Sequence, residues 1–507
     1  MEDSRRFLRL MPLESFARMI TEIFLFLVVV VLLFLLRNKE PPGAPPGPTR
    51  WPIIGSFSLA SNVKDQLALI DKYGDVVSLG VGGRNFIMVS NYKLAKEAFS
   101  KTEMNDRPGW RVMEHLGDGK PGIIGRNGDS WRISRRFHLR NLRDLGMGKS
   151  YLADAIHREA KLLVEDIRNY TDKPTHFPQS INVAVLNVIW QLVASRRYDL
   201  HEAKILELLA LIKEFQKNAK FVLLPDIFPW LNYLPNVLFK RLFKYDWREK
   251  NSVRAKAFMK EIVDDHKTNF DPNNPRDVID NYLIELDKQK NETDSEVFSE
   301  DDLIRDIFDL FAAGFDTTSS TIRWASLYLA SHPEVQKKVQ RELDDVVGRD
   351  TLPSLLHRPR LHYLEATLHE VLRLAPPAIS GAPRMSADDV HIGGYLISKG
   401  STVFATIGAI QQDNRYWEQP EKFYPERFID ESGNFSVPKE GFLPFSVGKR
   451  SCIGEALARM ELYLFAAALL QNFSFAPPEG CQINLDPLDA PGMMLPREQD
   501  LIITSRT

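Results

Sequence analysis

The stretch FSVGKRSCIG, residues 445–454, holds one of only two cysteines in a chain of 507 residues. Cys452 stands in a loop between Gly448 and Gly454, just before a long apolar run. A helix N-terminus and a neighbouring cation such as Arg450 favour a thiolate over a thiol, so we expect this cysteine to ionise easily. The two glycines allow positive φ angles and the close approach of a flat ligand. An isolated cysteine is more commonly a small core residue, and these residues alone leave that alternative open.

The composition excludes several classes of protein. A net charge of −2 gives no global field that would attract nucleic acid. Cys452 and Cys481 could form one bridge at most, which argues against a secreted, disulfide-stabilised scaffold. Hydrophobic residues make up 44% of the chain, enough for a large core. Because no linker-like stretch follows residue 55, we predict one catalytic domain over residues 56–507.

The N-terminus carries an apolar run, IFLFLVVVVLLFLL, over residues 23–36. Extended back to Met19 it reaches about 18 residues, enough to span a bilayer at roughly 1.5 Å per residue. A cleaved signal peptide is the alternative, but no small-residue cleavage site follows. Prolines instead stiffen the next segment. We predict a membrane anchor with one transmembrane helix over residues 1–37 and a proline-rich tether over residues 38–55.

The remaining pattern is mainly helical, with small β-sheets. Alternating apolar residues predict strands over residues 76–82 and 85–90. A serine cap at Ser299 and the stop at Pro333 bound a predicted helix of about 34 residues. Two further helices are predicted over residues 360–374 and 455–472.

The long helix contains AGFDTT, from Ala313 to Thr318. Glycine inside a helix costs about 1 kcal/mol, so something must offset it. Small residues leave room beside a bound diatomic molecule, and the Thr317 hydroxyl can bond to the Ala313 carbonyl and loosen the helix. Asp316 could relay protons inward. The alternative is that small residues only permit close helix packing.

Five motifs together resemble the cytochrome P-450 family of haem-thiolate mono-oxygenases. The cysteine loop fits F-x-x-G-x-R-x-C-x-G at every fixed position, and A-G-x-D-T is matched in the long helix. An E-x-x-R pair, the FYPERF segment and a W-x-x-x-R pair complete the set. The resemblance extends from the tether to the C-terminus and implies the P-450 fold.

The resemblance also implies roles for individual residues. Cys452 would be the axial ligand of haem iron. Asp316 and Thr317 would be the catalytic residues that deliver protons. The implied haem contacts are Phe445, Trp131, Arg135, Arg384 and Arg450, the basic ones facing the two propionates. Glu370, Arg373 and Arg427 would form a structural network that holds the cysteine loop.

Four arginines follow helical spacing next to the W-x-x-x-R pair: Arg132, Arg136, Arg140 and Arg143. A stripe of charge is usually a solvated surface. In the family this helix lies where the electron donor docks, so the resemblance implies an NADPH-dependent flavoprotein reductase as partner.

The anchor and tether resemble the microsomal animal branch of the family, in the subgroup with many drug, steroid and terpenoid oxidisers. This implies the endoplasmic reticulum membrane, with the catalytic domain in the cytosol. The expected activity is hydroxylation or epoxidation of a lipophilic steroid, terpenoid, fatty acid or xenobiotic. Two alternatives stay open: a haem-thiolate isomerase or dehydratase that needs no reductase, and a haem-binding protein without turnover. The acid–threonine pair favours the mono-oxygenase.

Overall fold

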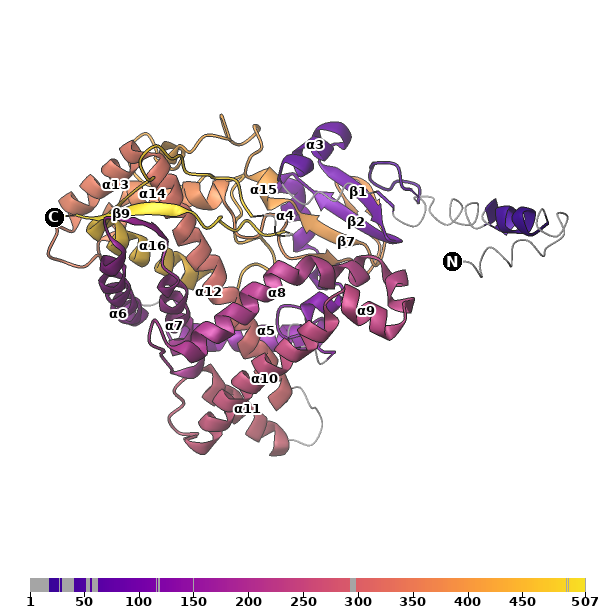
Figure 1. The fold of residues 1–507 in the computed structure, drawn as a ribbon, viewed down its shortest axis with the longest axis horizontal. Coiled ribbons are helices and arrows are strands. Elements are labelled where there is room, and N and C mark those ends of the chain that lie inside the picture. Colours follow the sequence, from indigo (N-terminus) through magenta and orange to yellow (C-terminus); the bar gives the residue numbers. More distant parts are fainter. Residues whose placement is uncertain are drawn as a thin grey trace, which may run out of the picture.

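The computed structural model describes residues 18–26, 28–29, 41–51, 55–56, 63–114, 116, 119–148, 150–291, 298–488, 490 and 492–506. Helices predominate in these ranges, and a four-stranded sheet built around β1, β2 and β7 lies to one side of the helical body (Figure 1). The predicted mainly helical chain with small sheets is confirmed.

The chain up to residue 291 supplies these helices: α3 (Val63–Tyr73), α4 (Tyr92–Ser100), α5 (Gly128–Asp144), α6 (Ser150–Ile167), α7 (Ser180–Ala194), α8 (Ala203–Ile227), α9 (Asn236–Leu242), α10 (Tyr245–Thr268) and α11 (Val278–Asn291). The second half supplies α12 (Glu300–Ser331), α13 (Pro333–Val346), α14 (His362–Leu374), α15 (Ile407–Ile410) and α16 (Glu455–Asn472). Short 3₁₀ turns occur at η1 (Thr102–Asn105), η2 (Arg111–Met113), η3 (Arg168–Tyr170), η4 (Pro229–Tyr233), η5 (Arg358–Arg360) and η6 (Pro425–Phe428).

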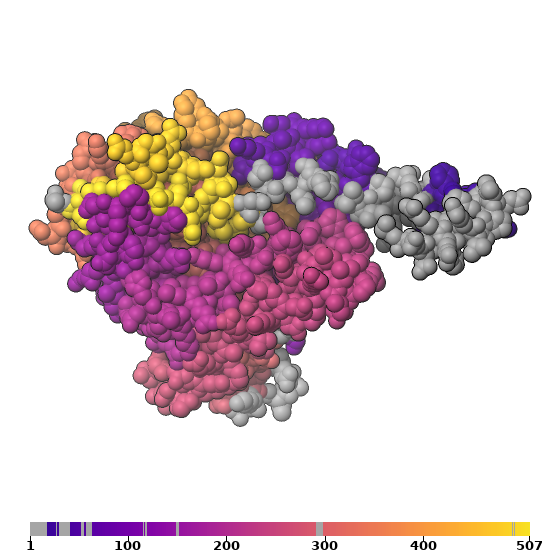
Figure 2. Space-filling model, in the orientation of Figure 1, coloured from indigo at the N-terminus to yellow at the C-terminus, as the bar shows by residue number. Residues whose placement is uncertain are grey.

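The strands join segments that are distant in the sequence. Their bounds are β1 (Val76–Val81), β2 (Arg84–Val89), β3 (Pro174–His176), β4 (Arg384–Met385), β5 (Val390–Ile392), β6 (Tyr395–Ile397), β7 (Thr402–Ala405), β8 (Phe473–Ala476) and β9 (Asp500–Ser505). The sheet orders are β1-β2-β7-β4, β3-β9-β8 and β5-β6. β9 pairs antiparallel with both β3 and β8, and Figure 2 shows the yellow C-terminal residues on the surface beside purple ones.

The long helix α12 passes through the middle of the molecule (Figure 1). It packs against α7, α10, α14 and α16. Most of its side chains are buried, as expected of a helix that is covered on all sides. Its cap is the predicted one, because the Ser299 hydroxyl accepts the amide of Asp302 at 3.1 Å. α12 therefore crosses the core and carries its central residues to the site described below.

The bounds of the two other predicted helices match the structure to different degrees. α16 has the predicted bounds. α14 begins at His362, two residues after the predicted start, because a proline places residues 358–360 in the separate turn η5.

The N-terminal segment is described only in part. Residues 18–26 and 28–29 are helical, and their large apolar side chains are exposed. In the described part of the chain no helix is both long and apolar enough to cross a membrane. The rest of the predicted anchor lies outside the described residues.

Candidate active site around Cys452

The cysteine loop folds back on itself before α16 begins. The amide of Cys452 donates to the carbonyl of Phe445 at 3.0 Å, and the amide of Ser451 donates to the carbonyl of Gly448 at 3.0 Å. Gly448 has the predicted positive φ, 77°. A Cβ atom on it would lie 1.9 Å from the Phe99 carbonyl oxygen. Glycine is therefore required here because the loop packs directly on the end of α4.

Gly454 does not use the positive φ that glycine allows. Its φ is −96°, outside the left-handed region, and it serves as the N-cap residue of α16. A Cβ atom at this position would meet nothing within 4 Å. The open space beside the loop thus agrees with the close approach of a flat ligand.

Cys452 is exposed although protein surrounds its side chain. The side chain therefore lines an internal space. Burial raises the pKa of its thiol, and the cation of Arg135 offsets this effect only in part. The expected thiolate-favouring environment was wrong for the protein alone, since desolvation outweighs the helix N-terminus and the nearby cations. A coordinating metal ion deprotonates a thiol outright and would reverse the balance.

Three predicted arginines meet around this loop, each bound to backbone carbonyls. Arg135 donates to the carbonyl of Ser451 at 2.7 Å. Arg384 donates to the carbonyl of Val447 at 2.6 Å. Arg450 donates to the carbonyl of Asn105 at 2.7 Å. The loop is thereby held by side chains of α5 and β4, and by its own Arg450 side chain, which binds the chain at Asn105.

Trp131 lies under this cluster, as its position one turn before Arg135 on α5 predicts. The Arg450 guanidinium carbon lies 3.7 Å from the centre of the Trp131 ring. Trp131 is buried. A cation held over a desolvated indole gains about 2 kcal/mol or more.

Arg107 is a fourth member that the sequence did not identify. It is buried and donates to the carbonyls of Ile124, Ala382 and Pro383 at 3.1, 2.8 and 2.6 Å. A single arginine in a loop carries no periodicity, so only the fold brings it to the site.

The four arginines around the cysteine loop concentrate positive charge, and no carboxylate of the described residues pairs with them. Among the described residues, no carboxylate pairs with Arg107, Arg135, Arg384 or Arg450, whereas nearby Arg126 pairs with Asp302 and Asp306 at 3.1 Å each. Burial and mutual repulsion lower the pKa of Arg450 to about 8, of Arg384 to about 9 and of Arg107 to about 10. Buried charge of one sign needs a counter-charge. The two carboxylates of a haem, placed beside the Cys452 thiol, fit this requirement.

α12 presents the predicted oxygen-activation residues. The Thr317 hydroxyl donates to the carbonyl of Ala313 at 2.8 Å, as predicted. Ala313 is exposed although it lies in the middle of a largely buried helix, so it too faces an internal space. Asp316 is buried, and its carboxylate accepts the Gln216 amide at 2.7 Å. Burial raises the pKa of Asp316, which suits a carboxyl group that holds a proton near neutral pH.

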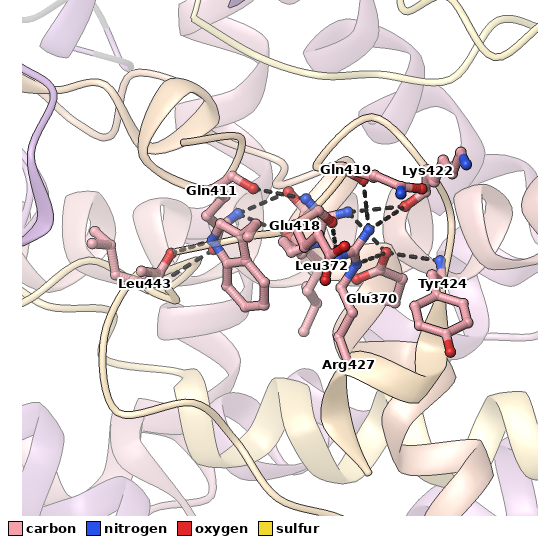
Figure 3. A network of polar contacts seen from close by, with 12 residues as sticks. Glu370, Leu372, Gln411, Glu418, Gln419, Lys422, Tyr424, Arg427 and Leu443 are labelled. Atoms are coloured by element: carbon pink, nitrogen blue, oxygen red, sulfur yellow. Dashed lines mark hydrogen bonds and ion pairs between the residues drawn. The ribbon is translucent and has the colours of Figure 1, made fainter. Parts of the chain in front are cut away.

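The predicted Glu370, Arg373 and Arg427 network is confirmed (Figure 3). Arg373 donates to both oxygens of Glu370 at 2.7 and 2.8 Å, and both side chains are fully buried. Arg427 donates to Glu370 at 3.3 Å. Gln411, which sequence analysis missed, connects this network to the cysteine loop. Its side-chain oxygen accepts the amide of Leu443, and its backbone carbonyl accepts the guanidinium of Arg373.

Phe445 has a second support. The Arg459 guanidinium of α16 lies 4.7 Å from the centre of its ring and donates to Nε2 of His369 on α14 at 2.7 Å. Burial, with the Arg459 charge, lowers the pKa of His369 to about 3, so its ring is neutral and can accept this bond. The loop is thus held between α14 and α16.

The four arginines Arg132, Arg136, Arg140 and Arg143 are exposed on α5, the helix that also carries Trp131 and Arg135. Arg132 pairs with Asp129, and Arg140 lies 3.7 Å from Asp144. These two contacts offset part of the positive charge of the stripe, while Arg136 and Arg143 keep the stripe basic.

Comparison with known proteins identifies relatives along nearly the whole chain. A family model described as cytochrome P450 matches residues 45–503. Cytochrome P450 2L1 of Panulirus argus is 42% identical over 451 residues, covering 88% of this chain and 91% of that protein. Cytochrome P450 2J3 of Rattus norvegicus is 37% identical over 472 residues, covering 91% and 92%. Cytochrome P450 2C3 of Oryctolagus cuniculus is 36% identical over 460 residues, covering 88% and 91%.

Proposed function

The chain belongs to the cytochrome P450 family, and we propose that it is a membrane-bound mono-oxygenase that inserts one oxygen atom from O2 into a lipophilic substrate. The family's cofactor is haem with an axial cysteine thiolate. The observation that carries the assignment to this site is the unpaired arginine cluster beside Cys452. Cys452 would supply the thiolate ligand, and Phe445, Trp131, Arg135, Arg384 and Arg450 would contact the haem.

The bound haem supplies the chemistry of O2 activation with two electrons. The protein's own residues hold the haem in position and deliver protons. The arginines hold the propionates, and the Glu370–Arg373–Arg427 network fixes the loop that carries Cys452. Thr317 and Asp316 deliver protons from α12, and the raised pKa of Asp316 supports its role as a proton donor. Buried, preorganised groups cost no reorganisation during reaction.

Electrons come from NADPH through a flavoprotein reductase that docks on the exposed arginines of α5. These residues stand on the helix whose buried face holds Trp131, so a partner bound there would lie close to residues that would hold the haem. Complementary charge raises the rate of such encounters. The long-range attraction extends over about 10 Å at 0.1 M salt.

Residues 1–37 anchor the protein in the endoplasmic reticulum membrane, residues 38–55 form the tether, and residues 56–507 form the cytosolic catalytic domain. The exposed apolar side chains of the described N-terminal helix support this, since Phe24 and Phe26 are 65% and 67% exposed. Tyr233 and Val237, between α8 and α10, are 90% and 84% exposed and support a second membrane contact. Deletion of residues 1–37 should therefore release much of the haem-loaded protein from membranes.

The test is a reconstitution of the full chain with reductase, NADPH, isotopically labelled O2 and a panel of lipophiles. We expect one labelled oxygen atom per product, and no product when NADPH or reductase is omitted. Conversion of a peroxide substrate without any electron donor would instead indicate an isomerase or dehydratase. Haem binding without turnover of any lipophile would indicate a non-catalytic haem protein.

A further inference from the structure

A cavity of about 200 Å³ lies between α8, α10 and α12. Its α8 and α12 walls are mainly apolar, with Leu208, Ile212, Phe308 and Ala312 among the lining residues. It reaches Ala313, whose carbonyl accepts the Thr317 hydroxyl. One end of the cavity is therefore adjacent to the segment proposed to deliver protons.

The α10 wall is different, because one face of this helix places two hydrogen-bond donors against the cavity. Arg248 and Asn251 are three residues apart and both line it. Arg248 is only 5% exposed. The Nε atom of Arg248 and the Nδ2 atom of Asn251 are both buried without a hydrogen-bond partner. Such orphaned donors destabilise the fold, and a charged group does so more than a neutral one.

The positive charge of Arg248 also lacks a paired carboxylate within the described residues. Its Nη2 atom donates to the carbonyls of Arg111 and Glu114 at 2.6 and 2.5 Å, which orients the guanidinium without neutralising it. The neighbouring carboxylate of Asp226 accepts the amides of Arg111 and Val112 at 3.0 Å each, and it interacts with the charge of Arg248 through space, without a direct bond. A buried cation in this position favours an anion in the cavity.

We propose that Arg248 and Asn251 bind the carboxylate of an amphiphilic substrate whose hydrocarbon part extends along the cavity towards Ala313. This rests on the proposed mono-oxygenase function and narrows its substrate class to lipophilic carboxylic acids. The carboxylate accepts the unused Nε–H and Nδ2–H groups, and the apolar walls cover the chain. Oxidation then falls on carbons distant from the carboxylate, because that end is held on α10.

The test is calorimetric titration of the haem-loaded enzyme with dodecanoate and with methyl dodecanoate, which has the same chain but no charge. We expect dodecanoate to bind at least about tenfold more tightly, since hydrogen bonds between charged groups are stronger than those of a neutral ester. Asn251→Asp places an internal carboxylate beside Arg248, so it should remove this preference by weakening dodecanoate alone. The same variant should unfold at a higher temperature than the wild type, because the buried charge gains a partner.

Asn218→Asp is the matched control, since Asn218 donates to the carbonyl of Glu214 on α8 and does not line the cavity. It should leave the preference unchanged. Arg248→Gln should reduce dodecanoate binding as well, but it also removes the bonds to Arg111 and Glu114. If the Arg248→Gln protein does not fold, the Asn251→Asp protein provides the deciding measurement. Equal affinity for acid and ester in the wild type, or a preference that survives Asn251→Asp, would overturn the inference. Neither result tests the mono-oxygenase assignment. The oxygen-labelling experiment tests that assignment separately, with uncharged lipophiles.

Discussion

The side chain of Gln411 joins the cysteine loop to the buried ion-pair network, because its Oε1 atom accepts the amide of Leu443 at 3.2 Å. Its Nε2 atom donates to the carbonyls of Leu372 and Arg373 at 3.0 and 3.1 Å, both in the last turn of α14 (Figure 3). The buried side-chain amide of Gln411 thus binds the end of one helix and positions the segment that leads to Cys452.

Gln411→Leu should therefore loosen the haem. The substitution keeps the volume but leaves the buried amide of Leu443 without a partner, at a cost of about 1–3 kcal/mol. We expect faster haem loss to an acceptor protein and a lower unfolding temperature. Gln412→Leu, on the neighbouring and less buried residue, should change neither. Haem loss at the wild-type rate in Gln411→Leu would show that the loop is held by other contacts.

The arginine cluster predicts an unusual pH dependence for the haem-free protein. Arg450, with its pKa lowered to about 8 in the folded state, keeps its ordinary high pKa when unfolded. Above about pH 8 the unfolded chain then binds more protons than the folded one, so the free energy of unfolding should rise with pH. Denaturant titrations between pH 7 and pH 10 measure this.

Arg450→Met should reduce that slope, and so should haem, whose propionates supply the missing charge. Arg341→Met, at an exposed site on α13, is the control and should leave the slope intact. A slope that is the same in the Arg450→Met protein and in the wild type would contradict the claim that the cluster is uncompensated.

Thr317→Ala should keep haem and substrate binding but divert electrons from product to peroxide or water. The hydroxyl is placed by its bond to the Ala313 carbonyl, and its loss removes a proton donor from the site. The measurement is product formed per NADPH consumed. Thr321→Ala is a close control, because Thr321 makes the same bond one turn later, to the Thr317 carbonyl at 2.9 Å, and is buried. Equal coupling in the two variants would remove Thr317 from proton delivery.

The motifs were predicted from the sequence where the chemistry is local. The bounds of α16, the bond of Thr317 to the Ala313 carbonyl and the Glu370–Arg373 pair all follow from helical spacing within a few residues. Arg107 and Gln411 could not be predicted, since each acts through contacts with residues far away in the chain. The pKa direction of Cys452 was wrong for a related reason: burial depends on the whole fold, whereas the sequence shows only neighbouring charges.

The arginines of α5 give a prediction that separates docking from haem binding. Arg136→Glu combined with Arg140→Glu should raise the reductase concentration needed for half-maximal turnover, and added salt should have a smaller effect on the variant than on the wild type. Turnover supported by peroxide should stay nearly unchanged, because it needs no partner. Lys217→Glu, at an exposed site on α8, is the control for charge reversal. Equal losses in the two assays would mean that these arginines support the haem or the fold.

The central claim is that Cys452 supplies the thiolate ligand of a bound haem. The most direct measurement is the absorption spectrum of the reduced, carbon-monoxide-bound protein, recorded for the wild type and for Cys452→His. The account predicts the long-wavelength Soret band of thiolate ligation in the wild type and its loss in Cys452→His, with Cys481→Ser, at the other exposed cysteine, retaining it. A wild-type protein without that band, or a Cys452→His protein that keeps it, would contradict the claim.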